Sequence, residues 1–395
     1  MKLLYITGSA PWPPTSGGAL RDFHFISHLQ SRHDVRVVVL DEAPVPPPPG
    51  IPADVEFWPY LRPGRRPAAT KWRMRREALR DAVHPSPQIV REHAPPDLRA
   101  AFRSLAGYAR ACDAVWVSRA HYARHALAAE FGGRLIVDFV DVEWAAQQSH
   151  QAHLPRGPYR ALARLDTWKL ARFERRVAGR AWRCVVCKEE DKGRLGAALS
   201  NVYVVPNGTA ANSPCSPEAA EPGRLLFVGL MSYGPNRDAA KWFVREVFQA
   251  VVSAARPPVL DIVGGDPPED VVELQGPASR VFVHGFVPDL RTCYDRAAVV
   301  VCPIRTGSGT RLKVLEALSY GKAVVATTEA IRGIDLRPGV DCLVADTAAE
   351  FATACSRALA DGGLRAVLGN SGRDRVLGRY SWDRIRADLD RVLTP

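Results

Sequence analysis

Arginine, lysine and glutamate stand near residue 310 at a spacing that could bind a diphosphate and a ribose. Arg311 and Lys313 follow a glycine-rich turn, Thr306–Thr310, and Glu316 lies three residues after Lys313. Glycine lets a ligand approach the backbone closely, and the free N–H groups at a helix start attract phosphate. Two cations could neutralise a diphosphate, and a carboxylate one helical turn further on could accept hydrogen bonds from a ribose diol. An ordinary turn with solvated charges is the alternative that spacing alone leaves open.

Such a turn needs a strand before it and a helix after it. Val299–Ile304 is an apolar run typical of a buried strand, Leu312–Tyr320 has helical spacing, and Ala323–Thr327 reads as a second buried strand. This order predicts a parallel βαβ unit. The pattern G-x-x-x-x-G-K-[ST] is absent, and no G-x-G-x-x-G opens a helix after the first strand. The sequence therefore predicts neither a P-loop nor an ordinary dinucleotide site.

The same strand–turn–helix rhythm runs through the chain and predicts an α/β protein of two doubly wound, Rossmann-like domains. A length of 395 residues suffices for two domains of about 200 residues each. Residues 1–205 form the first predicted domain, 206–223 have linker composition, 224–375 form the second domain, and 376–395 end the chain with a helix.

Two further groups of residues in the first half lie where open parallel sheets bind ligands. Gly17 and Gly18 open the first predicted helix, although they could simply relieve a tight turn. Asp138 and Asp141 lie towards the end of a predicted strand, Arg134–Glu143. These carboxylates could hold a hydroxyl-bearing substrate, whereas capping of the following helix is the structural alternative, above all for Asp141.

The excess of positive over negative charge lies in the first half of the chain. Residues 1–205 carry 31 Lys+Arg and 20 Asp+Glu, and residues 206–395 carry 22 of each, so the first half holds the whole excess of +11. The most basic segment, Tyr60–Asp81, mixes cations with Trp72 and Met74. We expect an anionic partner such as a membrane surface or a lipid phosphate, unless the charges merely solvate the protein. No nucleic-acid motif accompanies them, so no nucleic-acid partner is predicted.

The apolar runs and the cysteines bear on where the protein is located and on whether it binds a metal. No run approaches the roughly 20 apolar residues of a membrane span, and the apolar stretch Leu3–Ile6 is too short for a signal peptide. We expect a cytoplasmic protein that could attach peripherally to the inner face of the membrane. Cys184 and Cys187 form C-x-x-C on a predicted strand, where side chains three apart point to opposite faces. No metal site is predicted there.

The chain resembles retaining glycosyltransferases of the family 4 type (glycosyl transferases group 1), which have the GT-B fold of two Rossmann-like domains facing across a cleft. The resemblance spans nearly the whole chain. It rests on P-x-x-S-G-G at 13–18, V-V-P-N-G at 204–208, L-L-F-V-G at 225–229, G-F-V-P-D-L at 285–290 and, most specifically, G-S-G-T-R-L-K-V-L-E-A-L at 307–318.

The resemblance implies that the N-terminal domain binds a hydroxyl acceptor and the C-terminal domain binds a nucleotide-sugar. The donor is a substrate, and neither a cofactor nor a metal is expected. Arg311 and Lys313 would neutralise the diphosphate leaving group, and Asp138 or Asp141 would orient the acceptor. The expected donor contacts are Gly17, Gly18, Asn236, Val287, Gly309, Thr310, Leu312 and Glu316. The final helix would return towards the N-terminal domain.

Three departures from the family pattern bear on the expected activity. Ser308 replaces a glutamate near the transferred sugar, Asn236 and Arg237 replace an Arg…Lys pair, and Val140 stands roughly where relatives often have histidine. The resemblance implies hexosyl transfer, with retention through a front-face displacement, in cell-surface polysaccharide or glycolipid assembly on a lipid-linked acceptor. Glycosylation of a small secondary metabolite, or nucleotide-sugar binding without turnover, are the alternatives.

Overall fold

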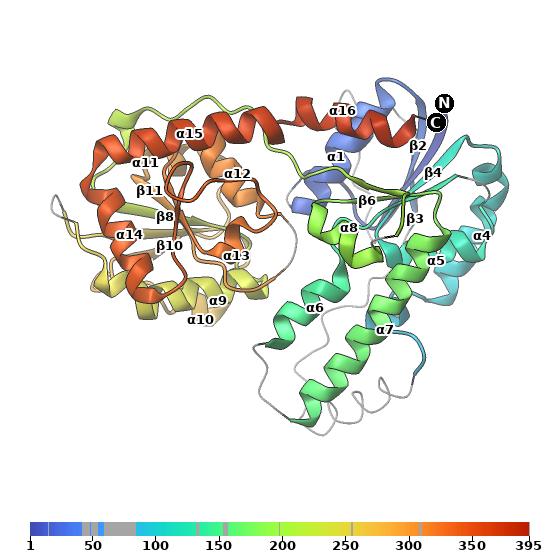
Figure 1. Cartoon of the computed structure of the whole chain (residues 1–395), viewed down its shortest axis with the longest axis horizontal. Helices are drawn as coiled ribbons and strands as arrows, with labels where there is room; N and C mark the ends of the chain where they lie inside the picture. Colours follow the sequence, from blue (N-terminus) through green and yellow to red (C-terminus); the bar gives the residue numbers. More distant parts are fainter. Residues whose placement is uncertain are drawn as a thin grey trace. The chain divides into compact units, whose positions relative to one another are not determined.

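The computed structural model describes residues 1–14, 16–41, 48, 54–58, 84–131, 134–152, 157–196, 198–253, 256–307 and 310–394. The basic segment Tyr60–Asp81, Ser308 and the expected donor contact Gly309 lie outside the described residues. The chain divides into two compact units, which Figure 1 shows in the colours of the sequence. Unit 1 is Met1–Pro206 together with Arg386–Pro395, and unit 2 is Asn207–Ile385.

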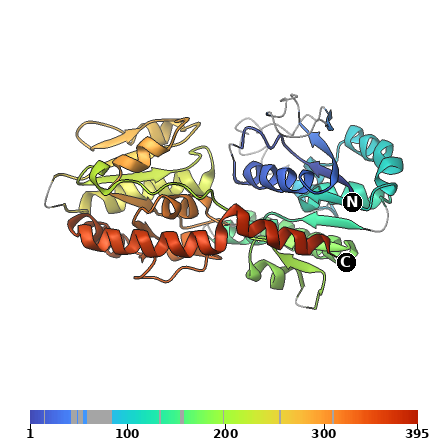
Figure 2. The same ribbon diagram turned by 90° about the horizontal axis from the view of Figure 1, so that it is seen from above.

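Unit 1 is built on a parallel sheet of seven strands in the order β3-β2-β1-β4-β5-β6-β7. The strands are β1 (Lys2–Thr7), β2 (Asp34–Leu40), β3 (Val55–Trp58), β4 (Ala114–Ser118), β5 (Leu135–Asp138), β6 (Arg183–Val186) and β7 (Val202–Val204). The helices are α1 (Gly17–Gln30), α3 (Gln88–Glu92), α4 (Pro96–Arg110), α5 (Ala120–Ala128), α6 (Glu143–Ala152), α7 (Pro158–Arg180) and α8 (Glu189–Gly196). Helices lie on both faces of this sheet (Figure 2), so its strands are almost continuously apolar and buried.

Unit 2 repeats this plan with six parallel strands in the order β10-β9-β8-β11-β12-β13. The strands are β8 (Arg224–Val228), β9 (Val259–Val263), β10 (Val281–Val283), β11 (Val299–Cys302), β12 (Val324–Ala326) and β13 (Leu343–Val344). The α-helices are α9 (Gly234–Trp242), α10 (Glu269–Val272), α11 (Arg291–Arg296), α12 (Leu312–Ser319), α13 (Thr328–Ile331), α14 (Ala348–Ala360) and α15 (Gly362–Tyr380). The last helix, α16 (Trp382–Leu393), begins in unit 2 and belongs to unit 1 from Arg386 onward. A π-helical turn, Phe243–Val247, and a short 3-10 turn, Phe248–Ala250, continue α9. In both sheets the strand order reverses beside the first strand, which is the arrangement of a Rossmann-like fold.

The end of β5 differs from the sequence prediction for a local reason. The predicted strand Arg134–Glu143 ends at Asp138, because Asp138 Oδ1 accepts the N–H of Val140 at 3.0 Å and Val140 has a φ of 58°. A left-handed residue cannot continue a strand. Helix α9 begins at Gly234, where Pro235 occupies the first turn.

The last residues of the chain belong to unit 1, although they follow unit 2 in sequence. Asp390 of α16 accepts a hydrogen bond from His28 Nε2 at 2.8 Å and pairs with Arg32 Nη1 at 2.7 Å. Arg183 of β6 donates to the carbonyl of Val392. These contacts attach the end of α16 to α1 and β6. Among the described residues, no helix is long and apolar enough to cross a membrane.

Candidate functional site

The most promising site in unit 2 lies at the carboxyl ends of β8 and β11, the neighbouring strands at which the strand order reverses. Chains leave these two strands in opposite directions, so their loops leave room for a ligand. The loop after β8 leads to Asn236 in the first turn of α9, and the loop after β11 leads to Arg311 and α12. The predicted diphosphate residues are therefore at the position where this fold binds ligands.

Lys313 lies in the first turn of α12 and crosses to the loop after β8. Its Nζ donates a hydrogen bond to Asn236 Oδ1 and lies 4.9 Å from the centroid of the Phe227 ring. Burial lowers the pKa of Lys313 from 10.5 to about 8, and Arg311 acts in the same direction. A cation held at a helix start with a neutral amide as its partner is prepared to receive an anion.

Two glycines at the ends of β8 and β9 make room for the Lys313 side chain. A Cβ atom on Gly229 would lie 2.5 Å from Lys313 Nζ and 2.7 Å from Asn236 Nδ2. Gly264 has a φ of 152°, and a Cβ there would lie 1.7 Å from the carbonyl oxygen of Gly229. Sequence reasoning missed both positions, although a glycine directly after each apolar strand, V-G in both cases, was the available signal.

Arg311 is held against the turn that precedes α12. It is 8% exposed, and its Nη2 donates to the carbonyl of Thr306 at 3.3 Å and lies 3.7 Å from Glu329 Oε1. The neighbouring Thr310 is buried, and its hydroxyl has no hydrogen-bond partner among the residues that the structure describes. A hydroxyl without a partner at this turn is available to a ligand.

Glu316 lies one turn further along α12. Its Oε2 accepts a hydrogen bond from the hydroxyl of Tyr294 at 3.0 Å. Burial raises the pKa of Glu316 above its ordinary value, although the bond from Tyr294 opposes the shift. Tyr294 is fully buried and stacks on Tyr320, with ring centroids 4.6 Å apart. Tyr294 fixes one carboxylate oxygen and was not singled out from the sequence, where it reads as a core residue of α11.

The remaining expected donor contacts of unit 2 have mixed surroundings. Asn236 is buried, and its Nδ2 donates to the carbonyl of Leu230 at 2.8 Å, which fixes the amide that Lys313 uses. Val287 and Leu312 are partly buried and pack against the core of unit 2. Their side chains therefore help to support the site.

In unit 1, Asp138 forms a buried ion pair with Arg21. Arg21 Nε and Nη2 lie 2.7 and 3.2 Å from the two carboxylate oxygens, and both side chains are fully buried. Arg21 Nη1 also donates to the carbonyl of Val205 at 2.9 Å. Burial opposes the charge of Arg21, but Asp138 outweighs it and raises the pKa. In this arrangement Asp138 has a structural role, and the geometry does not support the expectation that it orients an acceptor.

Asp141 remains the better placed of the two predicted carboxylates. Its Oδ1 is buried without a hydrogen-bond partner among the described residues. The predicted capping role belongs instead to Glu174, which accepts the N–H groups of Glu143 and Trp144 at 3.0 and 3.2 Å. Burial raises the pKa of Glu174 to about 8. Asp141 is thus left with an oxygen that a substrate hydroxyl could use.

Gly17 and Gly18 begin α1, whose N-cap Ser16 accepts the N–H of Ala19. A Cβ on Gly18 would lie 3.0 Å from Arg119 Nη2. Arg119 pairs with Glu143 at 3.3 Å. Gly18 therefore leaves room at the start of α1 for the guanidinium of Arg119.

The cysteines do not form a metal site in the part of the chain that is described, where no cluster of His, Cys, Asp and Glu could hold a metal ion. Cys184 and Cys187 are buried thiols whose pKa values burial raises. Such thiols are unreactive.

Comparison with known proteins agrees with this geometry. Residues 222–361 match the model of the family described as glycosyl transferases group 1. The matched residues lie in unit 2. They include Asn236, Arg311, Lys313 and Glu316. No curated protein sequence matches the chain significantly.

Solved glycosyltransferase structures resemble the whole chain. A sucrose-phosphate synthase from Thermosynechococcus elongatus has a TM-score of 0.72 at 17% identity, with 100% of this chain and 98% of that chain covered. HepE from Anabaena in complex with UDP has a TM-score of 0.66 at 15% identity, with 100% and 99% covered. The lipopolysaccharide outer core galactosyltransferase WaaB has a TM-score of 0.60 at 12% identity, with 100% and 99% covered. The predicted GT-B fold is confirmed.

Proposed function

We propose that the chain is a retaining glycosyltransferase that moves a hexosyl group from a nucleotide-sugar to a hydroxyl acceptor in cell-surface polysaccharide or glycolipid assembly. The observation that carries the donor assignment is the set of Lys313, Arg311 and Glu316 at the start of α12, beside the carboxyl ends of β8 and β11. HepE, a structural neighbour, has been solved with UDP and with UDP-glucose. A uridine diphosphate sugar is therefore the first donor to test.

The proposed chemistry follows from where charge develops. Breaking the bond between the sugar and the diphosphate places negative charge on the leaving phosphate, where Arg311, Lys313 and the N–H groups of α12 stabilise it. The acceptor oxygen forms the new bond on the same face of the sugar, and the leaving phosphate takes the acceptor proton. These cations and helix N–H groups supply the positive charge for this step, so the proposal includes neither a metal nor a cofactor.

The remaining residues are proposed to bind either the donor or the acceptor. Glu316, fixed by Tyr294, accepts hydrogen bonds from the ribose hydroxyls. Asp141 is the proposed residue for orienting the acceptor hydroxyl. Gly17 and Gly18 stay proposed donor contacts, as do the backbone groups of Leu312 and Val287. The acceptor itself is proposed to be lipid-linked, at the inner face of the cytoplasmic membrane.

Thermal unfolding with candidate donors tests the donor site. A ligand at 100 times its Kd stabilises the folded state by about 2.7 kcal/mol. UDP-glucose and other nucleotide-sugars are compared on the wild type, on Glu316→Ala and on the control Glu246→Ala, which replaces an exposed glutamate in the turn after α9. We expect one donor to raise the Tm of wild type and control but not of Glu316→Ala. If no nucleotide-sugar shifts the wild type, the donor assignment is wrong.

A second measurement separates transfer from binding alone. Slow hydrolysis of the stabilising donor by the wild type, with release of the nucleoside diphosphate, is the expected sign of catalysis. Lys313→Ala should abolish that release. Donor binding without release would favour a nucleotide-sugar-binding protein over an enzyme. Transfer to a small soluble acceptor without detergent or lipid would favour the secondary-metabolite alternative.

A further inference from the structure

The exposed face of α7 combines arginines with two apolar side chains. Trp168 is 55% exposed and Leu165 is 37% exposed. Arg164 and Arg172 are exposed, and Arg160 is partly exposed. Arg164, Trp168 and Arg172 follow each other at intervals of four residues, so they lie along one side of the helix. We call Arg160, Arg164, Leu165, Trp168 and Arg172 the α7 surface.

No exposed acid balances these arginines on α7. The helix has two acidic residues, Asp166 and Glu174. Glu174 is buried, and its carboxylate accepts the N–H of Glu143 at the start of α6. Asp166 is only partly exposed, and it accepts the N–H of Gln88 at 3.0 Å. The acids of α7 itself therefore leave the arginines of the α7 surface in excess, which favours an anionic partner.

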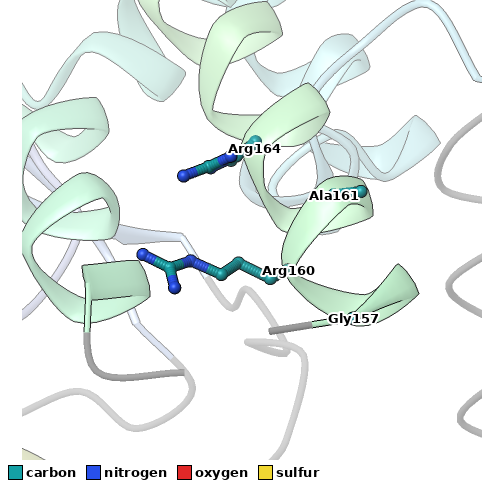
Figure 3. A pocket seen from close by; sticks show the side chains of 4 residues that line it. All are labelled: Gly157, Arg160, Ala161 and Arg164. Carbon is teal, nitrogen blue, oxygen red and sulfur yellow. The ribbon is translucent and has the colours of Figure 1, made fainter. Parts of the chain in front are cut away.

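The arginines of the α7 surface are arranged to receive several anionic groups. Arg160 and Arg164 extend from the same side of α7 (Figure 3) and line a shallow cavity of about 290 Å³ together with Gly157 and Ala161. Arg160 Nε has no hydrogen-bond partner among the described residues. Further along, the guanidinium of Arg172 lies 4.9 Å from the centroid of the Trp168 ring. That contact holds a cation and an indole together at the surface.

Side-chain hydrogen bonds hold α7 against α6. Gln151 Nε2 donates to the carbonyl of Ala163 at 2.8 Å, and Thr167 Oγ1 donates to Gln147 Oε1 at 3.0 Å. In Figure 1 the N-terminal half of α7 extends with α6 beyond the sheet of unit 1. The α7 surface is therefore presented on a fixed helix.

We propose that the α7 surface docks unit 1 onto a bilayer that contains anionic phospholipid. Tryptophan is favoured at the headgroup level because its ring is apolar while its N–H can stay hydrated. Leu165 beside Trp168 adds apolar area that can enter the acyl boundary, and the arginines pair with lipid phosphates. Nucleic acid is a poorer fit because an exposed leucine gains nothing against a phosphate backbone. This inference does not rest on the proposed function, since docking is measured without a donor.

Vesicle flotation of the full-length protein tests the proposal. Binding is measured to vesicles of phosphatidylcholine alone and of phosphatidylcholine with phosphatidylglycerol. The test variant is Arg164→Glu/Arg172→Glu. The control with the same change in net charge is Arg245→Glu/Arg357→Glu, because both residues are exposed in unit 2. A basic residue near an anionic leaflet contributes about 1 kcal/mol, or about fivefold in affinity, so the test variant should bind at least about 30-fold more weakly.

Tryptophan quenching gives a second readout. Brominated phosphatidylcholine in the anionic vesicles should quench part of the emission of wild type, and Trp168→Phe should lose most of that quenching although eight of the nine tryptophans remain. Unchanged thermal unfolding shows that each variant folds.

Three outcomes would overturn the proposal. They are the absence of wild-type binding to anionic vesicles, equal binding by the test variant and the control, and an unchanged quench in Trp168→Phe. Equal binding would place the membrane contact elsewhere in unit 1. Binding to single-stranded DNA but not to vesicles would identify the partner class as nucleic acid instead.

Discussion

Replacing Lys313 by methionine should stabilise the protein without ligand while it abolishes donor binding. A pKa lowered from 10.5 to about 8 means that the folded state disfavours the charged lysine by about 3 kcal/mol at neutral pH. Methionine keeps the apolar stem over Phe227 and removes that charge. It also removes the hydrogen bond to Asn236 Oδ1, which costs about 1 kcal/mol. The expected net gain is therefore about 2 kcal/mol.

The gain should depend on pH in a defined direction. Below pH 8 Lys313 is protonated in both the folded and the unfolded state, so the wild type carries the full penalty. Above the folded pKa of about 8, the folded state releases the proton and the penalty declines, until it disappears near the unfolded pKa. Lys313→Met should be clearly more stable than wild type at pH 7 and no more stable at pH 10.5.

Differential scanning calorimetry at both pH values measures this prediction. For a unit of this size, 2 kcal/mol corresponds to a Tm increase of about 4–8 °C in the transition of unit 2. The same experiment with UDP-glucose should raise the Tm of wild type and leave the variant unchanged. A Tm at pH 7 equal to or below that of wild type would refute the reasoning, because it would mean that Lys313 is not held at an energetic cost.

Two further substitutions test the packing around each unit's central loops. Gly229→Ala should displace the end of Lys313 and the Asn236 amide, since the new Cβ would lie 2.5 Å from Lys313 Nζ and 2.7 Å from Asn236 Nδ2. We expect donor binding to weaken at least tenfold in titration calorimetry. The control Gly265→Ala, whose Cβ would meet its nearest neighbour at 3.7 Å, should bind donor normally. Arg21→Met should destabilise unit 1 by about 3–5 kcal/mol in urea unfolding, because it leaves Asp138 charged and buried. The double variant Arg21→Met/Asp138→Leu should recover most of that loss. If it does not, the ion-pair assignment is contradicted.

The fold could be predicted largely from the sequence because buried parallel strands are continuous apolar runs. Val299–Ile304 and Ala323–Thr327 were predicted as strands and contain β11 and β12, and Leu312–Tyr320 contains α12. The errors arose where a single contact decides the local structure. The strand predicted to end at Glu143 ends at Asp138, since the left-handed turn at Val140 depends on a side-chain hydrogen bond that no apolar pattern signals.

The charged residues of the site could be predicted from the sequence, but the residues that hold them in place could not. Arg311, Lys313 and Glu316 are recognisable by type and spacing, because cations at a helix start are unusual without an anion. Tyr294 comes from another helix, so only the fold brings its hydroxyl to Glu316. Asp138 seemed to be free at a strand end, yet its partner Arg21 lies 117 positions earlier in the sequence. Pairings over such separations cannot be read from local pattern.

The bonds of Asp390 to His28 and Arg32 have a consequence for how the protein is made. Unit 1 needs residues from both ends of the chain, so a ribosome that has released unit 2 has still not supplied all of unit 1. Unit 2 can therefore fold before unit 1 is complete, and newly made chains should stay sensitive to proteases in unit 1 until α16 has been synthesised.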